Sequence, residues 1–370
     1  MVHISAPGKL MIAGEWAVLD GSKCIVAAVN KRVHSIVEPL AGNYISVSID
    51  DFRLQDIRFT WDGKLSLFKI YQVDAEKLKF TKESIEVALR FLIENGFKFK
   101  PFKIRTYGED TNIEVGGENK KVGFGSSAAA VVAIIASILN FHSYRASNED
   151  LYKLAAIAHY YAQGKVGSAF DVAASTYGGV IVYKRFDATW LTKKTETGEK
   201  LSSIVKDKWP GFFVEPLVIP ENLCLAVAWT KESASTGGMI KQMDSFRQSN
   251  AGKYMAIYDS ISHVVESLID SWKSSDEEKM LDSIRRNREL LRQLTKESGV
   301  SIETPELRQL AEIAEKYKAA GKLSGAGGGD CGFAISFDKD SIEKVKQAWK
   351  QAGLYPIDTD IDKNGVRLEK

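Results

Sequence analysis

The chain has 370 residues, of which 44% are hydrophobic and 26% are charged. This composition is typical of a folded globular protein and excludes a largely disordered chain, while the length favours two domains over one. Fifty Lys and Arg residues stand against 48 Asp and Glu residues, and the net charge of +2 gives no overall electrostatic attraction to nucleic acid.

Neither the apolar runs nor the cysteines indicate a membrane, secreted or zinc-binding protein. The longest uninterrupted apolar run, 128–136, is far shorter than the roughly 20 residues of a membrane span, and the N-terminus lacks the apolar core of a signal peptide. Cys24, Cys224 and Cys331 are odd in number and widely spaced, which matches neither a disulfide framework nor a zinc site. We therefore expect a cytoplasmic monomer or homodimer without a membrane or nucleic-acid partner.

The first hundred residues contain clear strand and helix patterns. Apolar and polar residues alternate in 45–49 and in 102–106, which predicts two strands with one solvated face each. An apolar stripe at helical spacing runs through 85–92 and stops at Asn95-Gly96, so a helix is expected between the strands.

Two further helices and a strand are expected before residue 190. The loop 123–127 runs into an apolar segment, which predicts a buried helix beginning at Ser126 or Ser127 with a serine hydroxyl as its cap. Ser147 opens another helix with the spacing of a capping box, and the apolar run 180–183 predicts a strand.

The periodic pattern weakens from about residue 185 to residue 220, where Lys, Thr and Asp mix with several Gly and Pro residues. We place the junction between two domains there, with expected bounds 1–190 and 191–370. After the junction the pattern predicts a strand at 223–229, helices near 240–270, 277–298 and 304–320, a strand at 332–337, a helix at 341–352 and a final short strand. Thr304 is the expected cap of the third of these helices, and Pro305 its first residue.

Two glycine-rich loops carry the chemical signal. Ser324–Gly332 holds five glycines among nine residues directly before a predicted strand, and the loop 123–125 precedes the buried helix. Glycines cluster where the backbone needs positive φ or brings bare amides close to a ligand, and the first amides of a helix attract phosphate. Either loop alone is also explained by a tight turn or an ordinary helix cap, whereas the two together favour phosphate binding.

Familiar nucleotide and metal motifs do not account for these loops. No Gly-Lys pair is followed by Ser or Thr, which excludes a P-loop, and the catalytic motifs of protein kinases are absent from the sequence. The five histidines do not have the spacing of metal ligands. Two further motifs remain, Ser5–Trp16 and Gly167–Asp171.

With motifs at 7–15, 123–129 and 324–332, in this order and spanning almost its whole length, the chain resembles the GHMP kinases, a family of small-molecule kinases. The resemblance implies a two-domain α+β fold. The N-terminal domain would be like domain 2 of ribosomal protein S5 and the C-terminal domain ferredoxin-like, with ATP, Mg²⁺ and a small acceptor in the cleft between them.

Within the family, the closer resemblance is to the kinases whose acceptor is 5-phosphomevalonate. It is carried by 8–15, 121–127, 229–235 and 324–332. It implies transfer of the γ-phosphoryl group of ATP to this acceptor, in the mevalonate route to isoprenoids. The alternatives are another kinase of the family, such as one that acts on mevalonate, and a catalytically silent sensor with the same fold.

Carried over position by position, the resemblance implies roles for individual residues. Lys9 and Asp171 would flank the transferred phosphoryl group as catalytic residues, and Ser126 and Ser127 would contact Mg²⁺. The expected ATP-binding set is Lys121, Gly123, Gly125, Ser126, Ser127 and Ala128. The expected acceptor-binding set is Lys9, Gly14, Glu15, Lys121, Ser168, Lys231, Ser233, Ser235, Gly327, Gly328, Gly329 and Asp330.

The sequence departs from the family pattern at one metal ligand. Relatives such as those acting on mevalonate carry a glutamate about eleven residues before the aspartate, where this chain has Tyr160. We assign no carboxylate ligand, since Mg²⁺ commonly keeps phosphate oxygens and waters as ligands. A phosphate-ester acceptor has its second pKa near 6 and is already largely a dianion, so Asp171 would orient Lys9 or Mg²⁺; an alcohol acceptor would instead require Asp171 as a general base.

Overall fold

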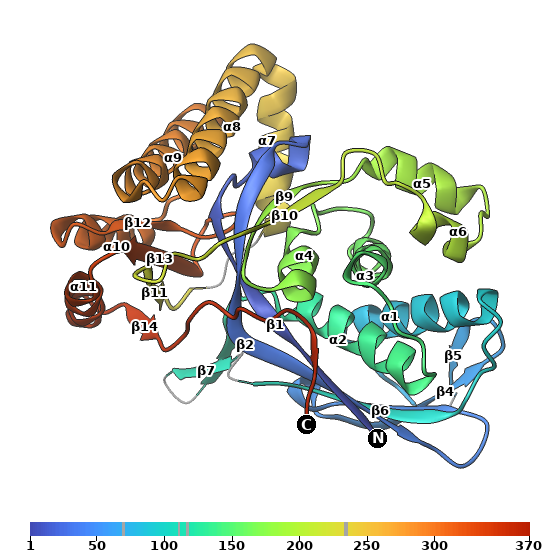
Figure 1. Cartoon of the computed structure of the whole chain (residues 1–370). Coiled ribbons are helices and arrows are strands. Elements are labelled where there is room, and N and C mark those ends of the chain that lie inside the picture. The colour runs from blue at the N-terminus through green and yellow to red at the C-terminus, as the bar shows by residue number, and fades with distance from the viewer. Residues whose placement is uncertain (69–70, 110–111, 116–117, 233–235) are drawn as a thin grey trace.

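In a computed structural model, the chain forms two units of mixed helices and strands that meet along a long pair of strands, β1 and β2 (Figure 1). The structure describes residues 1–370 apart from 69–70, 110–111, 116–117 and 233–235, and the side chains of 112–115, 118–121 and 236 also lie outside the description. No helix in these described ranges is both long enough and apolar enough to cross a membrane.

The larger unit contains a nine-stranded sheet. Its strands follow the order β10-β9-β2-β6-β3-β4-β5, with β1 paired to β2 and β15 paired to β1. The strands are β1 (Val2–Ala13), β2 (Lys23–Pro39), β3 (Ile45–Ile49), β4 (Leu54–Trp61), β5 (Leu65–Leu67), β6 (Phe102–Gly108), β9 (Val180–Lys184), β10 (Phe213–Leu217) and β15 (Arg367–Leu368). Only the β3–β6 pair among them is parallel within the described residues.

Four helices gather on one side of this sheet (Figure 1). They are α1 (Ala75–Glu94), α2 (Ser126–Phe141), α3 (Asn148–Ala162) and α4 (Phe170–Tyr177). The helices α2 and α4 pack directly on β1 and β2, and α1 and α3 pack against α2. Because α2 is apolar on nearly all sides, it is almost entirely buried between the sheet and the outer helices.

The remaining elements of this unit lie at its rim. They are the 3₁₀ turns Ala17–Asp20 and Asp50–Phe52, the hairpin of β7 (Asn112–Val115) and β8 (Glu118–Lys121), and the short helices α5 (Ala188–Glu196) and α6 (Leu201–Lys206).

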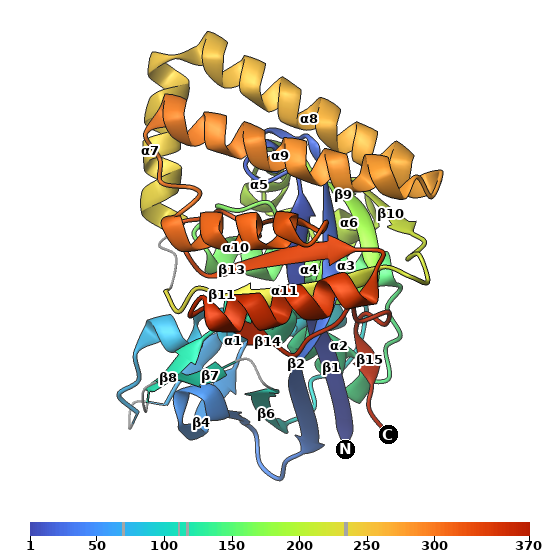
Figure 2. The ribbon, with the colours of Figure 1, turned by 90° about the vertical axis from the view of Figure 1, so that its left-hand side faces the viewer.

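The second unit is an antiparallel four-stranded sheet with helices on both faces (Figure 2). Its order is β12-β13-β11-β14, so in chain order the second, third, first and fourth strands are neighbours, as in a ferredoxin-like βαββαβ unit. The strands are β11 (Cys224–Trp229), β12 (Ala320–Leu323), β13 (Cys331–Ser336) and β14 (Tyr355–Ile357). The helices are α7 (Thr236–Ser249), α8 (Ala251–Lys273), α9 (Glu277–Ser298), α10 (Pro305–Lys316) and α11 (Lys339–Gln351).

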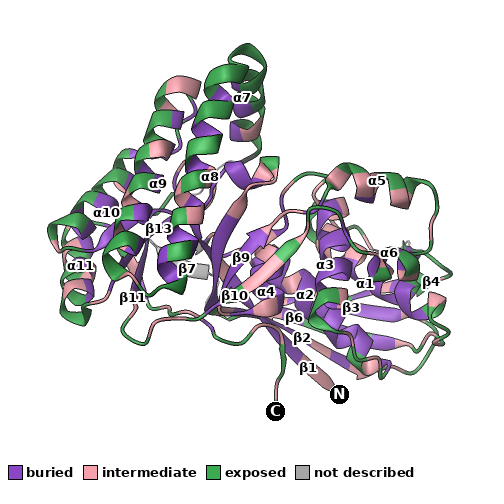
Figure 3. Ribbon diagram, turned by 45° about the horizontal axis from the view of Figure 1, so that its top comes forward, coloured by how far each residue is buried: buried purple, intermediate pink, exposed green. Residues whose placement is uncertain are grey.

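The two units share a buried core. The helices α10 and α11 cover one face of the small sheet, and its other face turns toward the upper part of β1 and β2. Trp229 and Phe333 of the small sheet belong to the same buried cluster as Leu10 and Ile12 of β1. Figure 3 shows buried residues continuing from one sheet into the other. This junction is therefore packed as a protein interior.

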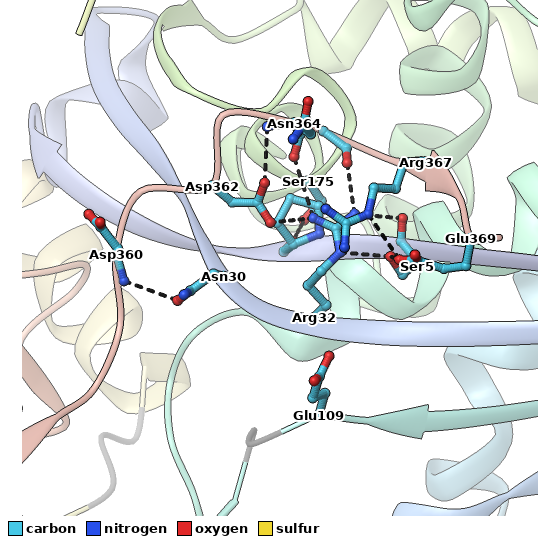
Figure 4. A network of polar contacts seen from close by, with 12 residues as sticks. Ser5, Asn30, Arg32, Glu109, Ser175, Asp360, Asp362, Asn364, Arg367 and Glu369 are labelled. Carbon is cyan, nitrogen blue, oxygen red and sulfur yellow. Dashed lines mark hydrogen bonds and ion pairs between the residues drawn. The ribbon is translucent and has the colours of Figure 1, made fainter.

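The C-terminal tail returns from the small sheet to the large one (Figure 4). Arg32 of β2 is 3% exposed, forms an ion pair with Asp362 and donates to the Gly365 carbonyl at 2.8 Å. The backbone N–H of Gly179, in the turn after α4, donates to the Asp362 carbonyl at 2.7 Å. The tail therefore braces β1, β2 and α4 together, because β15 also pairs with β1.

Most elements with a clear local pattern are confirmed. These are the strands at 45–49, 102–106, 180–183, 223–229 and 332–337 and the helices through 85–92 and at 277–298 and 341–352. Ser147 accepts from the Asp150 N–H at 3.1 Å, and Thr304 accepts from the Leu307 N–H at 3.3 Å with Pro305 next to it, as the capping patterns predict. Cys24 and Cys331 are buried free thiols.

Two expectations of secondary structure are wrong, and elements in two parts of the chain were not predicted. The helix near 240–270 is two helices, because the chain leaves helical geometry at Asn250, whose φ is −140°. The helix expected at 304–320 ends at Lys316, and the residues Ala320–Leu323 form β12. The segment 185–220 contains α5, α6 and β10.

The long strands β1 and β2 also escaped detection, because both of their faces are largely buried and their residues do not alternate. β10 pairs with β9, so part of the second half extends the first sheet; the domain boundary at residue 190 stays a prediction.

Candidate active site

Lys9 lies on β1, just after a bulge between Pro7 and Gly8. Its backbone N–H donates to the Phe124 carbonyl at 2.7 Å, and its side-chain Nζ donates to the Gly123 carbonyl at 2.9 Å. This approach requires a glycine at position 8, because a Cβ there would lie 2.8 Å from the Phe124 carbonyl oxygen. The strand β1 therefore carries Lys9 and packs closely against the loop that follows β8.

The helix α2 begins at Ser126, and Gly125 is its N-cap residue with φ +73°. The expected serine cap is wrong, since no side chain caps this helix; a glycine in the left-handed region turns the chain into the helix without steric cost. The Ala128 amide donates to the Gly125 carbonyl at 3.0 Å and so is used within the helix. The amides of Ser126 and Ser127, which precede it, have no partner inside the helix.

The two serines differ in their surroundings. Ser126 is 8% exposed, and its buried hydroxyl oxygen has no hydrogen-bond partner in the described part of the chain. Ser127 is more exposed, and its Oγ lies 3.4 Å from Nε2 of His159. A buried hydroxyl without a partner at a helix N-terminus suits a phosphate group or a metal ion bound to that phosphate.

Lys9, Gly125 and Asp171 meet at one point although they are far apart in the sequence. A Cβ on Gly125 would lie 3.0 Å from Cγ of Lys9 and 3.6 Å from Cβ of Asp171. The Phe170 ring lies 5.9 Å from Nζ of Lys9. The side chains of Lys9 and Asp171 thus both lie next to the start of α2.

Asp171 is held in the first turn of α4 by the backbone around it. Ala169, the N-cap residue, has φ +59°, and Oδ1 of Asp171 accepts from the Val172 N–H at 2.9 Å. Its other oxygen, Oδ2, lies 3.9 Å from Nε2 of His159. The carboxylate is therefore oriented but remains 19% exposed.

His159 of α3 belongs to this site and was not predicted from the sequence. It is 2% exposed, and its ring stacks on Phe80 of α1 with 5.2 Å between the ring centroids. Burial lowers the pKa of His159, while the charge of Asp171 acts in the opposite direction. A single histidine on an apolar helix face is ordinarily a core residue, so the sequence pattern offers no signal for it.

The second glycine loop is fastened onto β1 and the turn after it. Ser324 Oγ accepts from the Met11 N–H at 2.8 Å, and the Ala326 carbonyl accepts from Trp16 Nε1 at 3.2 Å. Gly327, with φ +82°, leaves no room for a side chain, because a Cβ would lie 2.1 Å from the Ile302 carbonyl oxygen. This loop is thus shaped by close backbone packing. It also passes near Lys9, because a Cβ built on Gly325 would lie 3.9 Å from the Lys9 Nζ atom.

Asp330 joins the two glycine loops. Its Oδ1 accepts from the Gly123 N–H at 2.9 Å, while Lys9 holds the carbonyl of the same Gly123. Burial raises the pKa of Asp330, and the Gly123 hydrogen bond and the Lys9 charge partly offset this. The chain thus uses Asp330 as a fixed contact between motifs that are about 200 residues apart.

Three residues of the expected acceptor set lie in the packed interior. Glu15 is 1% exposed and forms an ion pair with the fully buried Lys322, whose pKa burial lowers and Glu15 raises. Gly14 packs against Cys24, and Ser168 is 4% exposed with its carbonyl bonded to the Tyr183 hydroxyl. These three residues therefore pack and bond within the protein interior.

The segment after β11 runs beside the second glycine loop. Lys231 is exposed with φ +69°, and the Asp330 N–H donates to the Glu232 carbonyl at 2.9 Å. Gly328 and Gly329 complete the loop at φ +76° and +123°. Of the other expected residues, Ser233 and Ser235 lie outside the described residues, as does the side chain of Lys121.

A nucleoside triphosphate with Mg²⁺ fits these residues. The amides at the start of α2, the unpartnered Ser126 hydroxyl and the Lys9 ammonium group can contact phosphate oxygens. Within the described ranges, no group of three or more His, Cys, Asp or Glu side chains could hold a metal ion alone. Mg²⁺ would therefore take its ligands from phosphate oxygens, water and the Ser126 hydroxyl, which suits its preference for partial hydration.

Two family profiles match the chain. The profile described as GHMP kinases N terminal domain matches residues 82–179, and the profile described as GHMP kinases C terminal matches residues 268–354. The first match contains the loop at the start of α2 and Asp171, and the second contains the glycine loop of Asp330.

Whole-length similarity extends to named enzymes. The chain is 32% identical to a phosphomevalonate kinase of Streptomyces sp. (strain CL190), with 95% of each chain covered. It is 28% identical to a mevalonate kinase of Thermococcus gammatolerans over 100% of this chain and 98% of that one. Its fold matches that of Streptococcus pneumoniae phosphomevalonate kinase in complex with phosphomevalonate and AMPPNP, with a TM-score of 0.81, 26% identity, and 98% and 100% of the two chains covered.

Proposed function

Because the chain belongs to the GHMP kinase family, and is therefore an ATP-dependent kinase of small molecules, we propose that its acceptor is 5-phosphomevalonate. The products would be 5-diphosphomevalonate and ADP, in the mevalonate route to isoprenoids. The observation that carries this proposal is the whole-length similarity to a phosphomevalonate kinase, together with the convergence of Lys9, Asp171 and both glycine loops at one point.

The proposed mechanism rests on position and charge. Phosphoryl transfer needs the attacking and leaving oxygens aligned and the developing negative charge balanced. Lys9, held by the Gly123 carbonyl, would balance the negative charge that develops on the transferred phosphoryl group. The start of α2 would hold the ATP phosphates, and Mg²⁺ would supply further charge neutralisation there.

Asp171 acts in this proposal as an orienting group. A phosphate-ester acceptor is largely a dianion at neutral pH and needs no base to remove a proton. The Asp171 carboxylate, fixed by the Val172 amide, would keep Lys9 or Mg²⁺ in line with the acceptor. The second glycine loop, fastened to β1 and to Gly123, would close over the acceptor and exclude water.

Mevalonate is the second candidate acceptor, because the chain is also similar over its whole length to a mevalonate kinase. That acceptor is an alcohol, and Asp171 would then have to take its proton. The two cases differ in a measurable way, since only the alcohol reaction should lose nearly all activity when Asp171 is replaced by Asn.

A coupled ADP-release assay tests the proposal. The purified protein is given ATP, Mg²⁺ and, in turn, mevalonate, 5-phosphomevalonate and 5-diphosphomevalonate. We expect kcat/KM for phosphomevalonate to exceed that for mevalonate by at least about a hundredfold, since a lost charged contact costs ~1.5–3 kcal/mol and the missing phosphate removes more than one. A preference for mevalonate would contradict the proposal.

Lys231 gives a second test of the acceptor. Lys231→Ala should raise KM for phosphomevalonate about tenfold and KM for ATP much less, because Lys231 is exposed and directly precedes Glu232, whose carbonyl accepts from the Asp330 N–H of the second glycine loop. Lys318→Ala is the matched control, as Lys318 is also an exposed lysine at positive φ, 61° against 69°. Equal changes in both Michaelis constants would argue against a role in acceptor binding.

A further inference from the structure

His159 occupies a position between two groups of the proposed site. Its Nε2 lies 3.4 Å from Oγ of Ser127, at the start of α2, and 3.9 Å from Oδ2 of Asp171, at the start of α4. The same nitrogen atom therefore faces a residue of the expected ATP-binding set and a catalytic candidate. No other histidine ring in the described part of the chain forms a hydrogen bond or ion pair with Ser127 or Asp171.

The imidazole ring is fixed in place by its surroundings. His159 is 2% exposed, so water does not compete for its ring nitrogens. Phe80 of α1 stacks against one face of the ring at an angle of 30°, and α3 itself packs on α1, α2 and α4. A ring held in this way presents Nε2 in a single direction.

A neutral imidazole can form a hydrogen bond with either neighbour through Nε2, and the tautomer decides which one. With the hydrogen on Nε2, it donates toward the Asp171 carboxylate; with Nε2 bare, it accepts from the Ser127 hydroxyl. The 3.4 and 3.9 Å separations are longer than good hydrogen bonds, and such contacts commonly tighten when substrates close a site.

We propose that His159 is a positioning residue, which sets the distance and orientation of the Ser127 hydroxyl relative to the Asp171 carboxylate. This inference rests on the proposed phosphoryl-transfer site. His159 touches neither substrate in it. It keeps the ATP side and the acceptor side of the site in register, because α2 and α4 each carry one of the two groups and α3 holds the imidazole between them.

A core histidine without such a role is the competing explanation, and the chain contains a matched example. His142, directly after α2, is also 2% exposed, and its Nδ1 lies 2.9 Å from the Ile138 carbonyl. It packs against Phe102 and Phe141, and its other ring nitrogen, Nε2, has no hydrogen-bond partner among the described residues. Replacing His142 by Phe therefore removes a buried imidazole from the same unit without disturbing the proposed alignment.

The test compares His159→Phe, His159→Gln and His142→Phe by steady-state kinetics. Phenylalanine keeps the packing against Phe80 without a polar atom, and glutamine can place its amide near the position of Nε2. We expect His159→Phe to lower kcat by ~10–100-fold with both Michaelis constants within about threefold, since it disturbs alignment and not uniform binding. His159→Gln should recover at least about tenfold of that loss, and His142→Phe should keep the wild-type kcat.

Coupling to Ser127 separates a positioning role from a general loss of packing. In the Ser127→Ala background, His159→Phe should lower kcat by much less than in the wild type, because one partner of the contact is already gone. Three results would each overturn the inference. The effects of Ser127→Ala and His159→Phe on kcat could be fully additive, His159→Gln could be no more active than His159→Phe, or His142→Phe could lose as much activity as His159→Phe.

The kinetic tests use whichever acceptor the wild-type protein turns over fastest, so that an error in the proposed acceptor does not affect them. A measurement without catalysis stands beside them. The ¹⁵N resonance of His159 Nε2 should shift in Ser127→Ala and in Asp171→Asn, and stay unchanged in Lys318→Ala. Unchanged resonances in both Ser127→Ala and Asp171→Asn would refute the contact itself. This measurement does not use His159→Phe, so it remains valid if that variant fails to fold.

Discussion

Replacing Gly123 by Ala gives a sharp test of the link between the two glycine loops. A Cβ on Gly123 would lie 1.5 Å from Oδ2 and 2.5 Å from Cγ of Asp330, so the carboxylate has to move. Moving it breaks the 2.9 Å hydrogen bond between the Gly123 N–H and Oδ1 of Asp330. Gly123 does not have positive φ, so its backbone conformation is open to alanine.

The expected magnitude follows from two opposing effects. Loss of a hydrogen bond to a charged group costs about 1.5–3 kcal/mol, whereas replacing glycine by alanine at a compatible position stabilises by about 0.4–1 kcal/mol through the unfolded state. Gly123→Ala should therefore lower the free energy of unfolding by about 1–2 kcal/mol. In the Asp330→Ala background the clashing carboxyl group is absent, and the same substitution should stabilise by about 0.4–1 kcal/mol.

The assay is urea unfolding of the four proteins of this cycle, followed by tryptophan fluorescence, with the midpoints compared at constant slope. The sign of the Gly123→Ala effect should reverse between the two backgrounds. The same destabilisation in both backgrounds would refute the reasoning, because the cost would then arise from something other than Asp330.

Three further predictions concern catalysis and pH. Lys9→Ala should lower kcat by at least about a hundredfold while changing either Michaelis constant far less, as the ADP-release assay would measure, since its charge matters most in the transition state. Ser126→Ala should lower turnover by ~10–1,000-fold and raise the Mg²⁺ concentration needed for half-maximal rate, whereas Ser127→Ala should affect Mg²⁺ less; unchanged kinetics in both would argue against the phosphate site. Burial lowers the pKa of His142. Below its ordinary value of 6.5, the unfolded chain therefore binds a proton that the folded chain does not, and the free energy of unfolding falls as the pH drops. His142→Gln should make the loss of urea stability between about pH 6.5 and 5 less steep.

Local signals in the sequence were enough to place many elements. The capping residues Ser147 and Thr304 act through hydrogen bonds to amides three residues away, so their effect can be read from neighbouring residues alone. The apolar run after Gly125 predicts a buried helix for the same reason, because its burial follows from its composition. The motifs around Lys9, Gly123 and Ser324 also identified the family, since each is a contiguous phrase.

Contacts between distant residues were decided only by the tertiary structure. Lys9 lies next to the start of α2 because β1 pairs with β2 and the Lys9 N–H donates to the Phe124 carbonyl. No local sequence pattern predicts these contacts. Glu15 lies in a conspicuous motif, yet the structure buries it against Lys322, 307 residues away. His159 looks like a core histidine along its helix and enters the site only because α2, α3 and α4 pack together. Helix starts and glycine turns depend on interactions within a few residues. The position of a side chain in the site depends instead on how strands and helices pack across the whole chain. The sequence encodes that packing only through the complete core, so no local pattern predicts it.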